Sequence, residues 1–147
     1  MKIALVCSHG GHLTEMLFLM DAFKDHDIFF VTYNNFRTED LGYHKYLLEN
    51  IKTSPIKMIK AFNQFLRIFR KEKPEIVIST GSEIALPAFI VAKLFRKKTI
   101  FIESWCRVQT KSATGKMVYY ISDEFLVQWP QQLEIYGDKA KYRGAVI

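Results

Sequence analysis

Short apolar runs alternate with segments of helical periodicity along this 147-residue chain. The runs predict strands at residues 2–7, 27–33, 75–79, 99–103 and 124–128, with a weaker one near 50–53. Helical patterns lie between them, at residues 12–23, 55–73, 84–95 and 116–121, and residues 34–46 show no period and predict a long loop. This alternation is typical of a parallel sheet covered by helices on both faces. We therefore expect an α/β, Rossmann-like fold, with residues 1–147 forming a single domain.

The composition is that of an ordinary globular protein, with 49% hydrophobic and 24% charged residues. No apolar run reaches the roughly 18 residues of a membrane-spanning helix, and no basic and apolar leader precedes the first strand. We expect a cytoplasmic location from this pattern. A net charge of +6 favours an anionic partner, and nucleic acid, acidic lipid and a phosphorylated substrate all qualify.

A glycine turn follows the first strand and leads into the first helix, with the sequence Ser8-His9-Gly10-Gly11-His12. Such a turn presents bare backbone N–H groups at a positive helix end, which favours phosphate or carboxylate. A second glycine turn, at Gly81, follows the strand 75–79. Because the carboxyl ends of parallel strands share one edge, both turns are expected to face one crevice.

The third turn on that edge begins with Glu103, at the end of an apolar strand. A carboxylate in that position is costly unless it is paired or used. Glu103 is therefore a candidate for removing a proton from an attacking hydroxyl. His12 is a second candidate, because either side chain can act as a base near neutral pH if its environment tunes its pKa. The alternatives stay open: His12 as a hydrogen-bonding group for the loop or a phosphate, and Glu103 as a structural cap or the partner of Arg107.

Two other functional classes fit poorly. The first glycine turn is no G-x-G-x-x-G motif, and the second strand ends in Thr32-Tyr33-Asn34, without the carboxylate that holds a ribose. Most aromatic residues follow core-like periodicity, and no nucleic-acid recognition motif accompanies the positive charge. The sequence thus argues against dinucleotide and nucleic-acid binding, and glycosyl transfer fits better.

The helical segment 55–73 has an apolar half and a basic half. The apolar arc is wider than a helix needs to pack on a sheet, so we expect part of it to be covered by something else. An anionic bilayer and a partner protein are the candidates, and an ordinary core helix is the alternative. The predicted membrane contacts are Phe62, Phe65, Leu66, Phe69, Lys57, Arg67 and Arg70.

Four stretches in order resemble one known family. They are Ser8–Leu17, Ile102–Val108, Ser112–Lys116 and Val127–Pro130, and the likeness covers the whole chain. They resemble the membrane-recruiting subunit of the two-part N-acetylglucosaminyltransferase of asparagine-linked glycosylation, and its bacterial relatives in capsule and exopolysaccharide synthesis. The resemblance implies the acceptor-binding, N-terminal Rossmann-like half of a GT-B glycosyltransferase.

The resemblance also implies a division of labour. A partner subunit would hold the UDP-sugar, and this chain would bind a polyprenyl-diphosphate-linked saccharide for inverting transfer. No cofactor and no metal site are expected in this half, and a purely scaffolding subunit is the alternative. The N-terminal hydrophobic anchor of the eukaryotic members is not found in this sequence, which implies peripheral attachment to the cytosolic membrane face. The implied substrate-binding residues are Ser8, Gly10, Gly11, Thr14, Gly81, Ser104, Arg107, Ser112, Thr114 and Lys116, beside the catalytic candidates His12 and Glu103.

Overall fold

The computed structural model describes residues 1–146 and contains one seven-stranded parallel sheet; Ile147, the last residue of the predicted domain, lies outside the described residues. The strands are β1 (Lys2–Cys7), β2 (Asp27–Tyr33), β3 (Lys45–Leu48), β4 (Ile76–Gly81), β5 (Lys98–Ile102), β6 (Glu124–Val127) and β7 (Ala140–Tyr142). The helices are α1 (Gly11–Phe18), the short 3-10 helix η1 (Met20–Phe23), α2 (Phe36–Glu39), α3 (Pro55–Glu72), α4 (Ala85–Leu94), α5 (Ala113–Val118) and α6 (Gln132–Tyr136).

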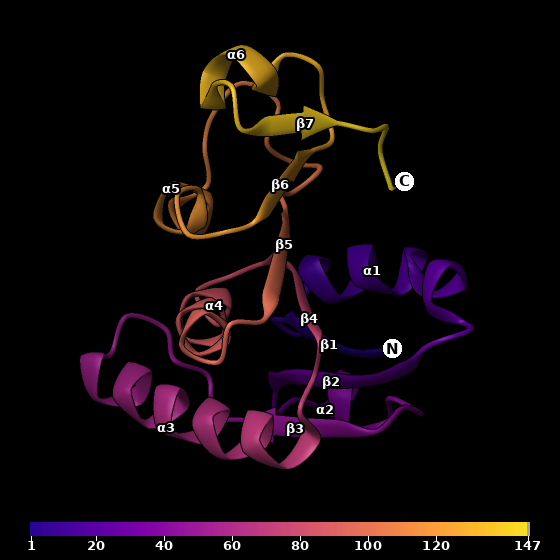
Figure 1. Cartoon of the computed structure of the whole chain (residues 1–147), viewed down its shortest axis with the longest axis vertical. Coiled ribbons are helices and arrows are strands. Elements are labelled where there is room, and N and C mark those ends of the chain that lie inside the picture. The colour runs from indigo at the N-terminus through magenta and orange to yellow at the C-terminus, as the bar shows by residue number, and fades with distance from the viewer. Residues whose placement is uncertain (147) are drawn as a thin grey trace.

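Helices cover both faces of the sheet, with α3, α4 and α5 on one face and α1 on the other (Figure 1). Neighbouring residues of β2 point to opposite layers: Phe29 and Val31 belong to the core beneath α3 and α4, and Phe30 to the core beneath α1. This double burial explains why the central strands read as continuous apolar runs rather than alternating ones.

The strand order is β3-β2-β1-β4-β5-β6-β7. The chain builds outward from β1 to β3, then returns to place β4 beside β1 and continues to the other edge. The order therefore reverses between β1 and β4, the position at which α/β sheets bind ligands beyond their carboxyl ends. The predicted Rossmann-like parallel fold is confirmed.

Two segments differ from the expectations. The weak strand predicted at 50–53 is wrong: the third strand is Lys45–Leu48, which pairs with β2, and the chain turns at Lys52 with a positive φ of 52°. Residues 34–46 are also not a continuous loop, because α2 forms within them. Asn35 caps that helix, since its side chain accepts from the backbone N–H of Arg37 at 3.0 Å.

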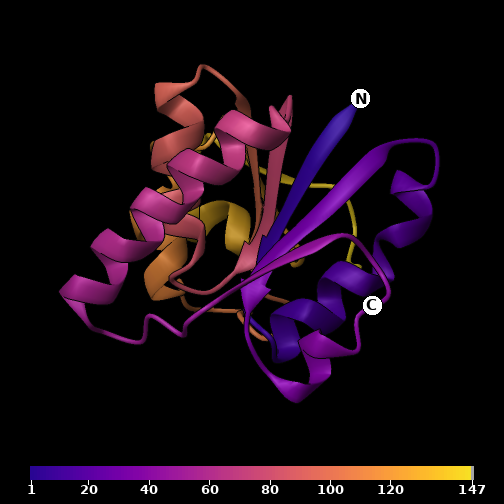
Figure 2. The ribbon, with the colours of Figure 1, turned by 90° about the horizontal axis from the view of Figure 1, so that it is seen from below.

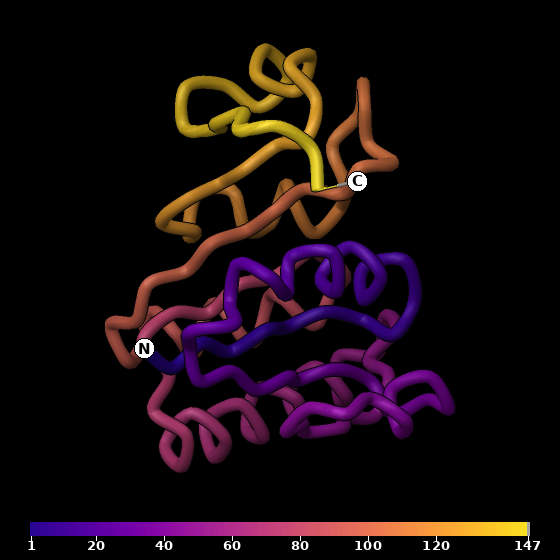
Figure 3. Tube along the Cα trace, turned by 90° about the vertical axis from the view of Figure 1, so that its right-hand side faces the viewer, coloured from indigo at the N-terminus to yellow at the C-terminus, as the bar shows by residue number. Residues whose placement is uncertain are grey.

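The carboxyl-terminal elements α6 and β7 were not predicted, because each is too short to show a period. Figure 3 looks onto the face covered by α1 and shows the chain after β7 turning back toward the middle of the sheet. There the backbone N–H of Val146 donates to Gln128 Oε1 at 3.0 Å.

Helix α3 corrects the predicted membrane contacts. Phe65 and Phe69 are only 0% and 2% exposed and belong to the core, so their assignment as lipid contacts is wrong. Phe62 and Leu66 are half-buried against the same core. The apolar arc is wide because α3 packs on the sheet and also beside α4. Arg67 and Arg70 lie exposed, whereas Lys57 is half-buried.

The amino-terminal end of α3 projects beyond the neighbouring elements (Figure 2). Ile56 and Ile59 are exposed there. Within residues 1–146, no helix combines the length and the apolar character needed to cross a bilayer.

Candidate active site

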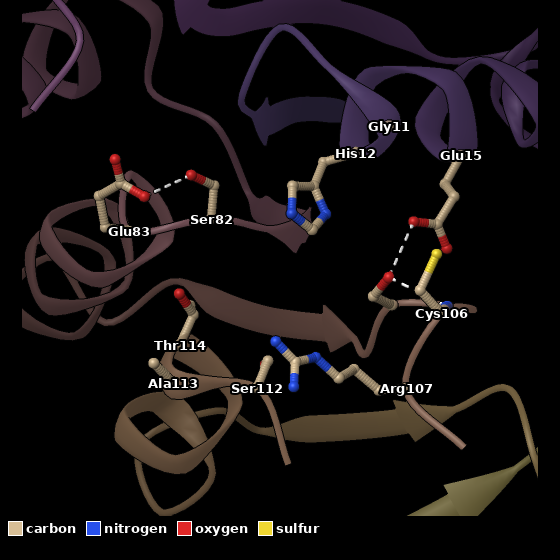
Figure 4. A pocket seen from close by; sticks show the side chains of 11 residues that line it. Gly11, His12, Glu15, Ser82, Glu83, Cys106, Arg107, Ser112, Ala113 and Thr114 are labelled. Carbon is tan, nitrogen blue, oxygen red and sulfur yellow. Dashed lines mark hydrogen bonds between the residues drawn. The ribbon is translucent and has the colours of Figure 1, made fainter. Parts of the chain in front are cut away.

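A pocket of roughly 440 Å³ opens where the strand order reverses, between the ends of β1, β4 and β5 (Figure 4). Three segments surround it: the first turns of α1, the β4–α4 turn and the β5–α5 loop. Of the predicted site residues, the pocket is lined by Gly11, His12, Ser104, Arg107, Ser112 and Thr114. The sequence thus placed three turns on one edge correctly.

His12 extends into this pocket from the first turn of α1 (Figure 4). Its Nδ1 lies 3.0 Å from the backbone oxygen of Thr80, and the Thr80 hydroxyl donates to the backbone oxygen of His12 at 2.6 Å. Because a carbonyl oxygen only accepts, Nδ1 is the donor in this contact. In the neutral ring, Nε2 then carries the free lone pair and can accept a proton.

Gly81 makes this position of His12 possible. A side chain at residue 81 would place its Cβ 2.6 Å from His12 Nδ1, and its φ of +132° is strained for any L side chain. Gly81 therefore supports His12 instead of lining the pocket itself. The next residue, Ser82, also has a positive φ of 79°, and its hydroxyl donates to Glu83 Oε2 at 2.6 Å. Such strain at a turn is typical of functional sites.

The glycine turn after β1 is open on its outer side. A Cβ at Gly10 or Gly11 would meet no atom of residues 1–146 within 4 Å, so the backbone there stays accessible to a ligand. Arg37 holds the turn from behind: its Nη1 donates to the backbone oxygens of His9 and Gly10, and its Nη2 to Thr14 Oγ1 at 3.0 Å. Thr14 therefore belongs to the support of the turn.

Arg37 was missed because it lies in the aperiodic segment 34–46. Ser8, Gly10 and Thr14 do not line the pocket, and Lys116 is exposed on α5 outside it. These four predicted substrate contacts are not brought to the pocket. Each lies in a sequence motif that contributes to the pocket, but other residues of the same motif form the pocket wall.

Glu103 does not face the pocket. It is 1% exposed, and its carboxylate accepts from the backbone N–H of Ser104 at 2.9 Å, from the N–H and hydroxyl of Ser112, and from the hydroxyl of Tyr136. Burial and then the bond to Glu103 raise the pKa of Tyr136, so that the phenol remains a donor. We correct the assignment of Glu103 from catalytic base to structural cap.

The same contacts change the role of Ser112. Its hydroxyl donates to Glu103 Oε2 at 2.9 Å and accepts from the N–H of Gly115 at 2.9 Å, which caps α5. Gly115 is required, because a Cβ there would lie 2.6 Å from Glu103 Oε2. Ser112 therefore lines the pocket with its hydroxyl already engaged.

The pocket is also lined by two acidic residues, Glu15 and Glu83, which the sequence analysis did not name as site residues. Glu15 follows His12 by three positions and so lies on the same helix face, which is a signal the sequence offered. Burial and then the carboxylate of Glu83 raise the pKa of the Tyr33 phenol.

Residues 1–146 contain no group of three or more His, Cys, Asp or Glu side chains placed to share a metal ion.

Comparison with known proteins identifies relatives over the whole chain. The family described as "Oligosaccharide biosynthesis protein Alg14 like" matches residues 44–146. The UDP-N-acetylglucosamine transferase subunit ALG14 of Mus musculus is 30% identical, with the match covering 100% of this chain and 83% of that protein. The UDP-N-acetylglucosamine–N-acetylmuramyl-(pentapeptide) pyrophosphoryl-undecaprenol N-acetylglucosamine transferase of Oceanobacillus iheyensis is 31% identical over 80% of this chain and 32% of its own length.

A solved structure shows the same fold. MurG of Acinetobacter baumannii matches with a TM-score of 0.74 and 15% sequence identity, over 88% of this chain and 42% of that one. This chain thus spans less than half of that protein. The resemblance seen in the four sequence motifs is confirmed by the family match and by the ALG14 relative, and the chain belongs to the Alg14-like family of oligosaccharide biosynthesis proteins.

Proposed function

We propose that this chain is the acceptor-binding subunit of a two-component inverting glycosyltransferase. The observation that carries the proposal is the His12 imidazole, which lines a pocket at the topological switch point. Its Nδ1 is bonded to the backbone oxygen of Thr80, and its Nε2 has no hydrogen-bond partner among residues 1–146. The acceptor is a saccharide linked to a polyprenyl diphosphate, and the donor is a UDP-sugar. The pocket would hold the acceptor hydroxyl within reach of Nε2.

The reaction is a single displacement. The acceptor hydroxyl gives its proton to His12 Nε2 while its oxygen forms a bond to the anomeric carbon of the donor. The bond between that carbon and the phosphate oxygen breaks, and UDP leaves with the electron pair. Attack from the face opposite the leaving group inverts the anomeric centre.

The diphosphate of the acceptor fits the polar side of the pocket. Gly11 offers its backbone at the amino end of α1, where the helix dipole favours negative charge. Arg107 supplies a cation from the β5–α5 loop, and Thr114 supplies a hydroxyl. A guanidinium is suited to phosphate because its donors form a planar fork.

The donor site belongs to a partner subunit in this proposal. One observation supports it: the mouse relative is named a transferase subunit. The partner would approach the carboxyl edge of the sheet and close the pocket over the acceptor. The chain itself needs no cofactor for the step assigned to it.

The test is a reconstituted transferase containing this chain, a donor-binding partner and a lipid-linked acceptor. His12→Ala should lower turnover by about 10³-fold, within the range for losing a general base. The control is His26→Ala, which changes an exposed histidine before β2. Near-normal turnover of His12→Ala in an intact complex would overturn the catalytic role and favour the alternative, a scaffold whose partner carries all catalytic groups.

We also propose that the protein attaches peripherally to the cytosolic face of an anionic membrane through the amino-terminal ends of α3 and α4. An apolar groove of roughly 210 Å³ lies there, lined by Met58, Ile59, Phe62, Leu86, Pro87 and Ile90. Lys57 and Lys60 flank it, and their only ion-pair partner among residues 1–146 is the exposed Glu49. Apolar surface beside lysines is typical of proteins that bind anionic bilayers.

Vesicle sedimentation tests the membrane contact. Ile59→Glu, at a side chain that lines the groove and is 63% exposed, should abolish binding to phosphatidylglycerol vesicles. Leu94→Glu is the matched control, because Leu94 is 61% exposed at the opposite end of α4. Equal binding by the two variants would show that this end of α3 is not the contact.

A further inference from the structure

Glu15 connects the helix that carries His12 to the loop that carries Arg107. It lies three residues after His12 on α1 and is 5% exposed. Its Oε1 accepts from the backbone N–H of Trp105 at 2.9 Å and from Gln128 Nε2 at 2.6 Å. Its Oε2 lies 3.5 Å from the hydroxyl of Ser104, which donates to it. Both carboxylate oxygens are thus engaged by groups outside α1.

The loop, residues 104–111, contains no helix or strand of its own, so side chains have to hold its shape. Gln132 Nε2 donates to the backbone oxygens of Arg107 at 2.7 Å and Thr110 at 2.9 Å. Trp129 Nε1 donates to the backbone oxygen of Trp105 at 2.6 Å. All of these anchors come from the β6–α6 side, and Glu15 is the anchor that comes from α1.

The second attachment of Glu15 is made through Gln128. Gln128 Nε2 donates to Glu15 and also to the backbone oxygen of Glu103 at 3.0 Å, where β5 ends. One side chain of β6's end therefore joins α1 to the beginning of the loop. The amide is buried and fully bonded, because its Oε1 accepts from the N–H of Val146.

The contacts of Glu15 make its burial depend on the loop. The ion pairs of residues 1–146 include none with Glu15. A buried carboxylate without a cation is costly unless fixed donors satisfy it. If the loop moved away from α1, Glu15 would lose the N–H of Trp105 and the hydroxyl of Ser104 together. The carboxylate therefore favours one position of the loop.

We propose that Glu15 is a positioning residue, which fixes the Arg107 loop relative to His12. Arg107 points back into the pocket in Figure 4, and its Nη1 donates to Thr110 Oγ1 within the same loop at 3.2 Å. The base and the phosphate-binding cation are then held at a set separation through one side chain. The inference rests on the proposed function of the pocket for the role of Arg107, and on the contacts alone for the position of the loop.

Tryptophan fluorescence tests the position of the loop without any ligand. The chain has two tryptophans, Trp105 and Trp129, and both belong to this network. Glu15→Ala should red-shift the emission and raise acrylamide quenching by about twofold, because the loop opens locally. Glu15→Gln retains an acceptor oxygen for Trp105 and should stay near the wild type. Glu39→Ala, at an exposed carboxylate on α2, is the control. Unchanged quenching in folded Glu15→Ala overturns the proposal.

A double-mutant cycle then tests whether Glu15 acts through Arg107. The probe is inorganic pyrophosphate, titrated by calorimetry into the full chain. Arg107→Ala and Glu15→Ala should each weaken binding by about tenfold, and the double variant by no more than either alone, because the second change removes nothing further. Additive losses in the double variant, or no loss in Glu15→Ala, contradict the proposal.

The two arms separate the possible failures. If the wild type does not bind pyrophosphate, the diphosphate site of the proposed function is wrong, and the quenching experiment alone decides whether Glu15 positions the loop. Far-UV circular dichroism of each variant identifies any that fail to fold. Partial recovery of pyrophosphate affinity by Glu15→Gln, relative to Glu15→Ala, supports positioning, because the amide oxygen restores the bond to Trp105.

Discussion

Buried carboxylates lie at both ends of the parallel strands, at the amino ends (the amino edge of the sheet) and at the carboxyl ends (the carboxyl edge). Their hydrogen-bond partners differ. At the amino edge, Glu72 of α3 is 2.6 Å from the ammonium of Lys2 and 2.9 Å from His44 Nε2, and the hydroxyl of Tyr46 also donates to it. At the carboxyl edge, the donors to Glu15 and Glu103 among residues 1–146 are all amides and hydroxyls. The first carboxylate is charge-paired and the other two are held by neutral donors.

The difference shows two uses of a buried charge. Burial by itself would raise the pKa of Glu72, but hydrogen bonds from Lys2, Tyr46 and His44 lower it to about 2. That interaction joins the end of α3 to the start of β1 and stabilises the fold. The neutral donors around Glu103 and Glu15 come from Ser104 and Trp105 of the loop, from Ser112 directly after it, and from Gln128 and Tyr136. Their carboxylates therefore determine the shape of the pocket wall.

The largest effect is expected from Glu103→Ala. It leaves the hydroxyls of Ser112 and Tyr136 without an acceptor in a buried site, which should lower the free energy of unfolding by about 3 kcal/mol. Urea denaturation measures this. Glu103→Gln, which keeps an acceptor oxygen, is the matched control and should lose less. A loss below about 1 kcal/mol for the alanine variant would contradict the role of Glu103 as a cap.

Glu72→Gln should lower the free energy of unfolding by about 2 kcal/mol. This loss is smaller than that of Glu103→Ala, because the side chain of Lys2 is 30% exposed and water can partly replace its partner. Raising the salt concentration should reduce the difference from the wild type, since the Lys2 ammonium of this ion pair is partly exposed to solvent. The control is Glu49→Gln, whose carboxylate pairs with Lys57 and Lys60 at the surface. If the loss in free energy of unfolding for Glu72→Gln did not change with salt concentration, the contrast between a charge-paired and a neutrally bonded carboxylate would fail.

The stability that Glu72 contributes should also depend on pH. Its pKa in the fold, about 2, lies below the ordinary value of 4.5. The ionised carboxylate therefore stabilises the fold fully above about pH 4.5, and this contribution disappears as the pH falls toward 2. Urea midpoints of the wild type and Glu72→Gln, measured from pH 6 to pH 2, should converge. Parallel curves would mean that the ion pair is not the source of the stability.

The smallest effect is expected for Glu72→Gln on pyrophosphate binding. The two edges lie at opposite ends of the strands, so the affinity should stay within about twofold of the wild type under conditions where both are folded. Calorimetric titration beside Glu15→Ala makes the comparison direct. A tenfold loss in Glu72→Gln would show that the amino edge also shapes the pocket, and the proposed division would fail.

Local patterns in the sequence were enough to predict much of the site. The apolar runs indicated the parallel sheet, and the two glycines before His12 marked the turn that bears it. Parallel strands place all such turns on one edge, so His12, Ser104 and Arg107 could be expected together. Glu15 and Arg37 were missed because their roles depend on contacts with Trp105, Gln128 and the backbone of the turn, which lie far away in the sequence.

By itself, then, the sequence determined the fold class, the edge of the sheet that carries the pocket and the family, because periodicity and short motifs are local. Only the tertiary structure decided which side chains are buried and which are exposed. Phe65 and Phe69 are core because α4 and the sheet enclose α3, and Ile59 is left outside. Glu103 looked like a base at the end of a strand, but Ser112 and Tyr136 enclose it. Whether a carboxylate reacts or holds a loop depends on which donors the fold brings to it.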